Sequence, residues 1–164
     1  MILWFAGTAF LAVWLVFRDP ALDHRLVIVG ALLPDAIDAW TGGPWLFHTV
    51  LAGVVLLLGI VLVTRGQRLR RRRWIALPIG LFLHLVFDGV WNDSELFWWP
   101  AFGVGEGLGE GSLPTFERAL AVNLVLEIAG LVVLVWAWRR FRLGEPERRT
   151  TFLRTGRLGR DLVS

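Results

Sequence analysis

Five apolar stretches, separated by charged or glycine-rich segments, dominate the hydrophobic pattern of this chain. They cover about residues 1–17, 26–40, 45–64, 74–91 and 118–138. Most of them approach or reach the roughly 20 apolar residues that a helix needs to cross the hydrocarbon core of a membrane. The pattern therefore predicts an all-α fold, a polytopic membrane bundle of about five transmembrane helices.

The second stretch differs from the others because it is short and contains a proline. Pro34 has no amide hydrogen to donate, and its ring crowds the carbonyl group of Gly30, four residues earlier. We expect the helix over residues 26–40 to be kinked or broken at Pro34, with Asp35 beside the break.

The arginines give the bundle an orientation. All 17 basic residues are arginine, and most of them lie in two segments, 65–73 and 139–164. Cytoplasmic loops of membrane proteins are enriched in arginine and lysine, so we place both segments inside, with the N-terminus outside and the C-terminus inside. This arrangement predicts a membrane domain over 1–140, an Arg-rich cytoplasmic tail over 141–164 and an outer glycine-rich, acidic loop over 92–117.

Composition supports a membrane protein and limits its chemistry. The 164 residues are 55% hydrophobic and include ten tryptophans, far too apolar a composition for a soluble domain of this size. There is no cysteine, so disulfides and thiolate ligands are excluded, and a transition-metal site would have to use histidine and carboxylate side chains. We expect a multi-pass protein of the plasma membrane, the inner membrane of a bacterium.

Several ionisable residues nevertheless lie inside the apolar stretches, where a charged group costs about 3 kcal/mol or more. They are Asp35, Asp38, His48, His84, Asp88 and Glu127. With a rise of 1.5 Å per helical residue, all of them fall in the outer half of the membrane, roughly 3 to 13 Å below the outer ends of their helices. Spacings of three or four residues place those of one helix on a shared face. We therefore expect four helices to build a single polar pocket that opens outward.

A divalent metal ion is the simplest explanation for such a pocket. His84 and Asp88 form an HxxxD pair on one helix face, and a second histidine with a pair of aspartates adds the nitrogen and oxygen ligands that zinc, manganese or iron accept. A bound cation would also keep clustered carboxylates ionised in a medium of low dielectric constant. Two non-enzymatic alternatives stay open, namely a hydrogen-bonded polar core that fixes helix packing and a proton or cation relay.

Three short motifs resemble those of the YdjM-like family of membrane-bound metal-dependent hydrolases. Residues 30–38 read GALLPDAID, residues 47–49 read FHT and residues 84–88 read HLVFD. The family has GALLPDxD, HRxxTHS and HxxxD segments at the corresponding places. The resemblance covers about residues 25–100 and implies a small multi-helix membrane protein with a hydrolytic metal centre.

Carried over to this chain, the resemblance implies a set of five metal ligands. They are Asp35, Asp38, His48, His84 and Asp88. Ala39 stands where the family has a histidine, and the HRxxTHS segment is reduced to His48 and Thr49. Fewer ligands imply one metal ion rather than two, or none.

We therefore expect a metal-dependent hydrolase of a lipid-linked or membrane-embedded ester or phosphoester. Zinc is the first candidate metal, followed by manganese and iron; the metal would activate a water, and Glu127 or Asp38 would act as general base. Expected partners are membrane lipids, a lipid-like substrate and anionic headgroups at the Arg-rich loop and tail. Assembly into a homo-oligomer is an open alternative, and we expect no specific binding of nucleic acid. A third alternative is that the tail recruits a partner and the membrane part is only its anchor.

Overall fold

The computed structural model describes residues 1–40, 43–101, 103, 108 and 118–159, and all regular structure within these residues is helical. The larger helices are α1 (Ile2–Phe17), α2 (His24–Asp38), α3 (Val50–Val63), α4 (Arg68–Trp74), α5 (Ala76–Asp88), α8 (Leu120–Arg140) and α9 (Pro146–Thr155). Three single-turn elements are η1 (Leu46–His48), η2 (Val90–Asn92) and α6 (Ser94–Phe97). The predicted all-α fold is confirmed.

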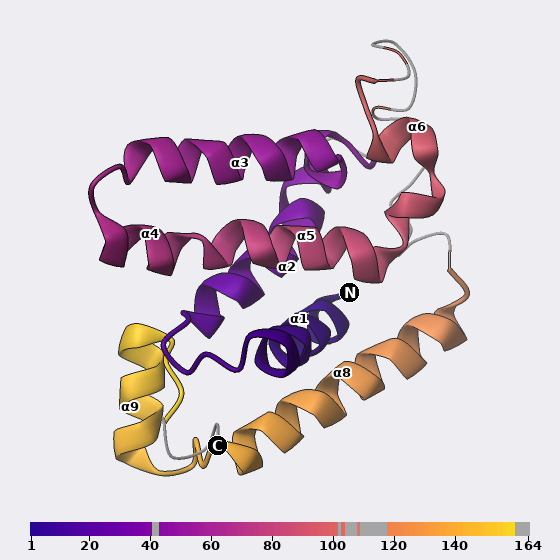
Figure 1. The fold of residues 1–164 in the computed structure, drawn as a ribbon. Coiled ribbons are helices and arrows are strands. Elements are labelled where there is room, and N and C mark those ends of the chain that lie inside the picture. The colour runs from indigo at the N-terminus through magenta and orange to yellow at the C-terminus, as the bar shows by residue number, and fades with distance from the viewer. Residues whose placement is uncertain (41–42, 102, 104–107, 109–117, 160–164) are drawn as a thin grey trace.

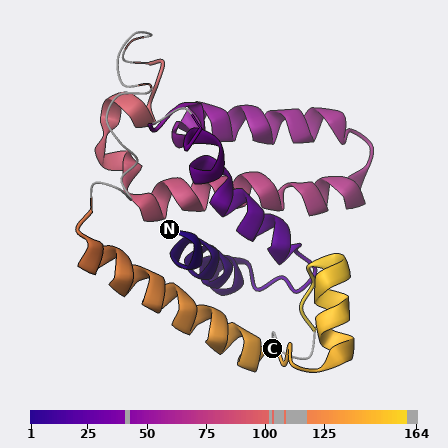
Figure 2. The same cartoon turned by 180° about the vertical axis from the view of Figure 1, so that it is seen from behind.

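The helices α2 and α5 form the centre of the molecule. They cross each other, and α3 runs alongside α5 on the side away from α1 (Figures 1 and 2). On the opposite side, α1 packs against both α2 and α8, so that α8 touches the rest of the bundle mainly through α1. The helix α4 leads through Ile75 directly into α5, and α9 lies beside the start of α2 (Figure 1).

Two pairs of glycines allow helix backbones to touch. A Cβ atom on Gly30 in α2 would overlap with the carbonyl oxygen of Leu77 in α5, and one on Gly80 in α5 would overlap with the carbonyl of Val27 in α2. Gly7 and Gly130 permit the same close approach between α1 and α8. Small residues at such crossings are typical of helix contacts in membranes, where close packing replaces the hydrophobic effect as the source of stability.

The main apolar core lies between α1 and α2. Phe5, Ala9 and Val13 recur every four residues along α1 and therefore share one buried face. This face packs against Val27 and Ala31 of α2. The core therefore covers one side of α2, while α5 covers the side that carries Gly30.

The two ends of the bundle are marked by contacts between segments that are distant in sequence. At one end the start of α1 packs against the first half of α8, because Glu127 accepts a hydrogen bond of 2.7 Å from the amide of Ile2. At the other end the segment after α9 returns to the start of α2, where the amide of Leu158 donates to the carbonyl of Pro20 at 3.0 Å. We call these the site end and the arginine end.

One helix in the described part of the chain, α8, is long and apolar enough to cross a membrane, with 21 residues. The other predicted spans form shorter helices, of 16 residues in α1, 15 in α2, 14 in α3 and 13 in α5. The multi-pass arrangement of five spans therefore stays a prediction.

Two further expectations concern the proline in α2 and the outer loop. The helix α2 is not broken at Pro34, because it continues through this residue to Asp38. Of the outer loop predicted over 92–117, most lies outside the described residues, and its first part forms the end of η2 and the short helix α6.

Candidate metal centre

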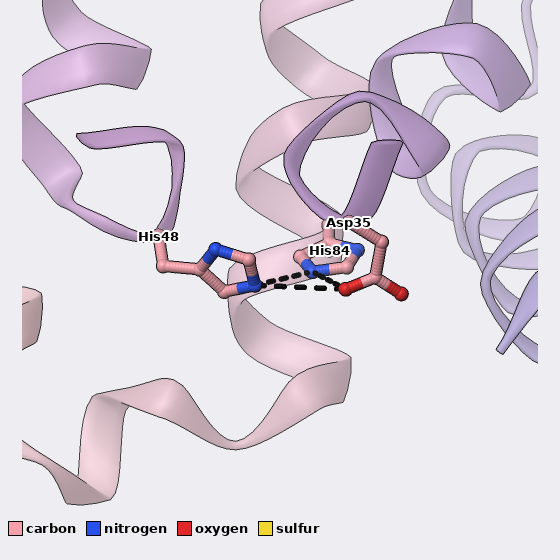
Figure 3. Close-up of side chains that lie close together, drawn as sticks. All are labelled: Asp35, His48 and His84. Carbon is pink, nitrogen blue, oxygen red and sulfur yellow. Dashed lines mark hydrogen bonds and ion pairs between the residues drawn. The ribbon is translucent and has the colours of Figure 1, made fainter. Parts of the chain in front are cut away.

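Three side-chain atoms that can bind a metal ion converge at the site end, one from each of three elements. Asp35 lies near the end of α2, His48 ends η1, and His84 lies in α5 (Figure 3). The Nε2 atoms of the two histidines are 3.4 Å apart, and the Oδ1 atom of Asp35 lies 3.6 Å from His48 Nε2 and 3.7 Å from His84 Nε2. Both histidines are fully buried, whereas Asp35 is one-fifth exposed.

The orientation of His84 is fixed by the backbone of α2. Its Nδ1 atom lies 2.7 Å from the carbonyl oxygen of Ala31. Since a carbonyl can only accept, Nδ1 carries the hydrogen and Nε2 presents a lone pair to the cluster. The ring of Phe5 packs against the imidazole with 4.1 Å between the ring centroids, which closes the site on the side of α1.

His48 is fixed in the same way, but by a carboxylate. Its Nδ1 atom donates to Oδ2 of Asp38 at 2.6 Å, and the same oxygen accepts a 2.8 Å hydrogen bond from the amide of Trp45. The next residue, Thr49, caps α3 by accepting from the amide of Ala52. The sequence FHT therefore holds His48 in the turn that precedes α3, with its Nε2 lone pair toward Asp35.

Asp88 borders the cluster from the end of α5. Its Oδ1 atom accepts a hydrogen bond of 3.2 Å from the guanidinium group of Arg118, which also donates to the Asp88 backbone carbonyl. The Oδ2 atom is buried, has no hydrogen-bond partner among the described residues and lies 3.9 Å from His48 Nε2. Gly89 follows in the left-handed conformation, with φ of 80°, and ends the helix there.

The arrangement calls for a positive charge between the three converging atoms. Two imidazole lone pairs and a carboxylate oxygen face one another, and the Oδ1 atom of Asp35 is buried without a hydrogen-bond donor among the described residues. A tetrahedral zinc site with ligand distances of about 2.0 to 2.1 Å has edges of about 3.3 Å. The observed separations of 3.4 to 3.7 Å lie close to that value. The Asp35, His48 and His84 group therefore fits a single metal ion.

The other oxygen of Asp35 is held by a different partner. The α-amino group of Met1 lies 3.3 Å from Asp35 Oδ2. This contact leaves Oδ1 directed at the two histidines. One carboxylate thus faces an ammonium group on one side and the candidate metal position on the other.

The predicted site residues take three different positions. Asp35, His48 and His84 meet in the cluster, whereas Asp38 acts through His48, and Asp88 lies beside the cluster. Glu127 lies elsewhere in the structure: its two oxygens accept hydrogen bonds of 2.7 and 2.8 Å from the amides of Ile2 and Leu3. Glu127 therefore caps the start of α1, where a carboxylate also interacts favourably with the helix dipole.

Sequence reasoning did not connect two neighbours of the site to it. Arg118 binds Asp88, although they are separated by 30 residues, and Phe5 covers His84 from a different helix. Arg118 lies outside the two Arg-rich segments, 65–73 and 139–164, but the sequence does not show which carboxylate it binds. Nothing in the sequence around Phe5 distinguishes it from the other apolar residues of α1.

Comparison with protein-family models, curated proteins and solved structures gives no match to this chain.

Proposed function

We propose that this protein is an integral membrane protein that binds one divalent metal ion through Asp35, His48 and His84, with zinc as the first candidate. The observation that carries the proposal is the convergence of three potential ligand atoms, 3.4 to 3.7 Å apart, of which Asp35 Oδ1 has no hydrogen-bond partner among the described residues. A chain of carboxylate, histidine and metal, here from Asp38 through His48, is a common way to orient a zinc ligand. The carbonyl of Ala31 serves His84 in the same manner.

We propose further that the centre is hydrolytic and acts on a lipid-linked or membrane-embedded ester or phosphoester. Catalytic zinc usually has three protein ligands, so that its fourth position is open to water. A zinc ion held in this way would lower the pKa of the water. Asp88 is better placed than Glu127 to accept a proton, because its Oδ2 atom is buried beside His48 while both oxygens of Glu127 are bonded to α1. Arg118 would hold Asp88 in place through its hydrogen bond to Oδ1. The motifs that resemble the YdjM-like hydrolases contribute the same residues.

The surface of α8 supports membrane insertion. Gly130 and Ala137 are the buried residues of this helix, while large apolar side chains such as Leu124, Ile128 and Val132 are exposed. A monomeric soluble protein rarely exposes so long an apolar surface. Together with the arginines gathered at one end, this surface supports an orientation in which the site end faces outward, with α1, α2, α3 and α5 as further spans.

A non-enzymatic role is supported by a separate observation. The carboxylates at the site end each contact a different element: Asp38 holds η1, Asp88 holds Arg118 before α8, and Asp35 holds the start of α1. Such a network could serve helix packing or relay a proton instead of holding a metal ion. The two roles differ in one measurable property, namely metal content.

The test is metal analysis of the full chain purified in detergent and exchanged into excess zinc before desalting. We expect about one zinc ion per chain, and loss of the ion in His84→Gln and His48→Gln. The matched control is His24→Gln, because His24 is equally buried but lies at the arginine end, where its Nδ1 contacts the carbonyls of Leu22 and Gly156. Wild-type protein without stoichiometric zinc, manganese or iron, or equal losses in all three variants, would contradict the metal site.

A further inference from the structure

A second cavity lies at the arginine end, on the far side of the molecule from the metal centre. It has a volume of about 230 Å³ and is formed by α4, α9 and the turn before α2. Four arginines line it, Arg72 and Arg73 from α4 with Arg154 and Arg157 around the end of α9. Figure 1 shows α4 and α9 on the same side of the bundle, next to the start of α2. A single water occupies roughly 30 Å³, so the cavity has room for a phosphate group.

The cavity carries excess positive charge. Arg72 pairs with Asp19, and Arg73 pairs with Asp23 at 3.1 Å. The guanidinium groups of Arg154 and Arg157 have no hydrogen-bond or ion-pair partner among the residues that the structure describes. Two positive charges are therefore left over in a confined space, and both can donate two parallel hydrogen bonds to a phosphate.

The wall that carries these two arginines is fixed to α2 by several contacts. The carbonyl of Gly156 accepts a 3.0 Å hydrogen bond from the amide of His24, and Arg25 bonds both Asp23 and the carbonyl of Leu153. Gly156 has a φ of 69°, and a Cβ atom there would collide with Asp23. Arg154 and Arg157 therefore stand on either side of an anchored turn, which limits the entropy that a bound anion would have to remove.

The rim of the cavity has an apolar part. Leu69 lines it and is 81% exposed. Trp74, at the end of α4, does not line the cavity, but it is partly exposed and its ring centre lies 5.9 Å from the guanidinium carbon of Arg73, which does. A guanidinium cluster beside exposed leucine and tryptophan matches a ligand whose phosphate is joined to an apolar body. Free inorganic phosphate would use only the arginines.

We propose that this cavity binds the phosphate of an anionic lipid headgroup at the cytoplasmic surface of the membrane. The inference rests on the membrane orientation in the proposed function, but not on the metal centre. Arg154 and Arg157 bind the phosphate, Arg72 and Arg73 add charge at the opposite wall, and Leu69 contacts the acyl region. The site differs from a general attraction of basic segments to anionic membranes, because it depends on two particular arginines.

The experiment compares two double variants that remove the same charge. Arg154→Gln/Arg157→Gln changes the cavity. The control Arg65→Gln/Arg68→Gln changes two exposed arginines that do not line the cavity, one before α4 and one at its first residue. The full chain in neutral detergent is titrated with short-chain phosphatidylglycerol, short-chain phosphatidylcholine or inorganic phosphate, and binding is followed by thermal shift. We expect phosphatidylglycerol to bind the cavity variant at least about tenfold more weakly than wild type, and the control variant within about twofold.

Other outcomes overturn the proposal in distinct ways. Equal losses in both double variants would indicate delocalised attraction between charges. Inorganic phosphate binding as tightly as phosphatidylglycerol would make the cavity a free-anion site, and equal binding of phosphatidylcholine would remove the requirement for net negative charge. Zinc content is measured on the same samples. An unchanged zinc content in the cavity variant demonstrates that this variant folds. Wild-type protein without zinc would contradict the metal centre but would leave the result on lipid binding intact. Arg157→Lys, which keeps the charge but loses the forked donor, is expected to bind with intermediate affinity.

Discussion

Replacing Asp38 by asparagine removes one charge from behind the candidate metal centre without touching its three ligands. Asp38 is fully buried, and its Oδ2 atom accepts hydrogen bonds from His48 Nδ1 at 2.6 Å and from the Trp45 amide at 2.8 Å. Asparagine has nearly the same shape and can still accept from His48 through its amide oxygen. The substitution therefore tests what the charge contributes, rather than the effect of a cavity.

The expected loss of zinc affinity follows from the geometry of His48. A carboxylate behind a ligating imidazole increases its basicity and fixes the tautomer that leaves Nε2 free. Removing such a partner typically costs 10 to 100-fold in metal affinity, which corresponds to about 1.4 to 2.7 kcal/mol of binding free energy. We place Asp38→Asn in this range because the 2.6 Å hydrogen bond is short and completely shielded from water.

The assay is competition for zinc between the detergent-purified protein and a chromophoric chelator at fixed pH. The matched control is Asp93→Asn, which removes the same charge from a residue whose carboxylate caps α6 by accepting from the amide of Leu96. We expect wild-type affinity for the control. Wild-type affinity in Asp38→Asn, with His48→Gln still abolishing binding, would refute the reasoning that Asp38 acts through His48.

Three further predictions concern the parts that support the site. Gly80→Ala should destabilise the protein by about 1 to 3 kcal/mol because the added methyl group meets the backbone of α2. The control Gly59→Ala places its methyl group in open space and should be neutral or stabilising by up to about 1 kcal/mol. Thermal unfolding of both variants measures the difference. Glu127→Ala should cost about 1 kcal/mol of stability through loss of the α1 cap and leave zinc content unchanged. Burial lowers the pKa of His24 below its usual value, so the unfolded chain takes up a proton first as pH falls below about 6.5 and the folded state loses stability there; chelator-treated protein melted at pH 7.5 and 5.5 should show a smaller difference in His24→Gln than in wild type.

The convergence of Asp35, His48 and His84 could be predicted from the sequence because the depths of these residues depend on local regularities. The rise per residue of a helix places Asp35 and His84 at similar depths, and it places His48 near the start of the span predicted over residues 45–64, in the same half of the membrane. The spacing of four residues between His84 and Asp88 puts both on one face of α5. Depth and shared faces follow from helix geometry in any bundle whose helices alternate in direction. They could therefore be predicted without knowing how the helices cross.

The roles of Asp38 and Glu127 could not be predicted in this way, because they depend on partners that are distant in sequence. Glu127 meets the amides of Ile2 and Leu3 across more than 120 residues, through the close packing of α1 on α8. Asp38 meets His48 only because η1 turns the histidine toward α2 before α3 begins. Nothing in the sequence states which carboxylate will face a helix end and which will face a histidine.

The contact between α2 and α5 links the stability of the fold to the chemistry of the site. Gly30 and Gly80 let the two backbones touch, and the residue after Gly30 is Ala31, whose carbonyl oxygen lies 2.7 Å from His84 Nδ1. His84 follows Gly80 by four residues and therefore lies one turn further along the same face. Any side chain that separates the helices at Gly80 must also lengthen the hydrogen bond that fixes the His84 tautomer. Gly80→Ala should accordingly weaken zinc binding as well as folding, whereas a substitution that destabilises α9 should affect folding alone.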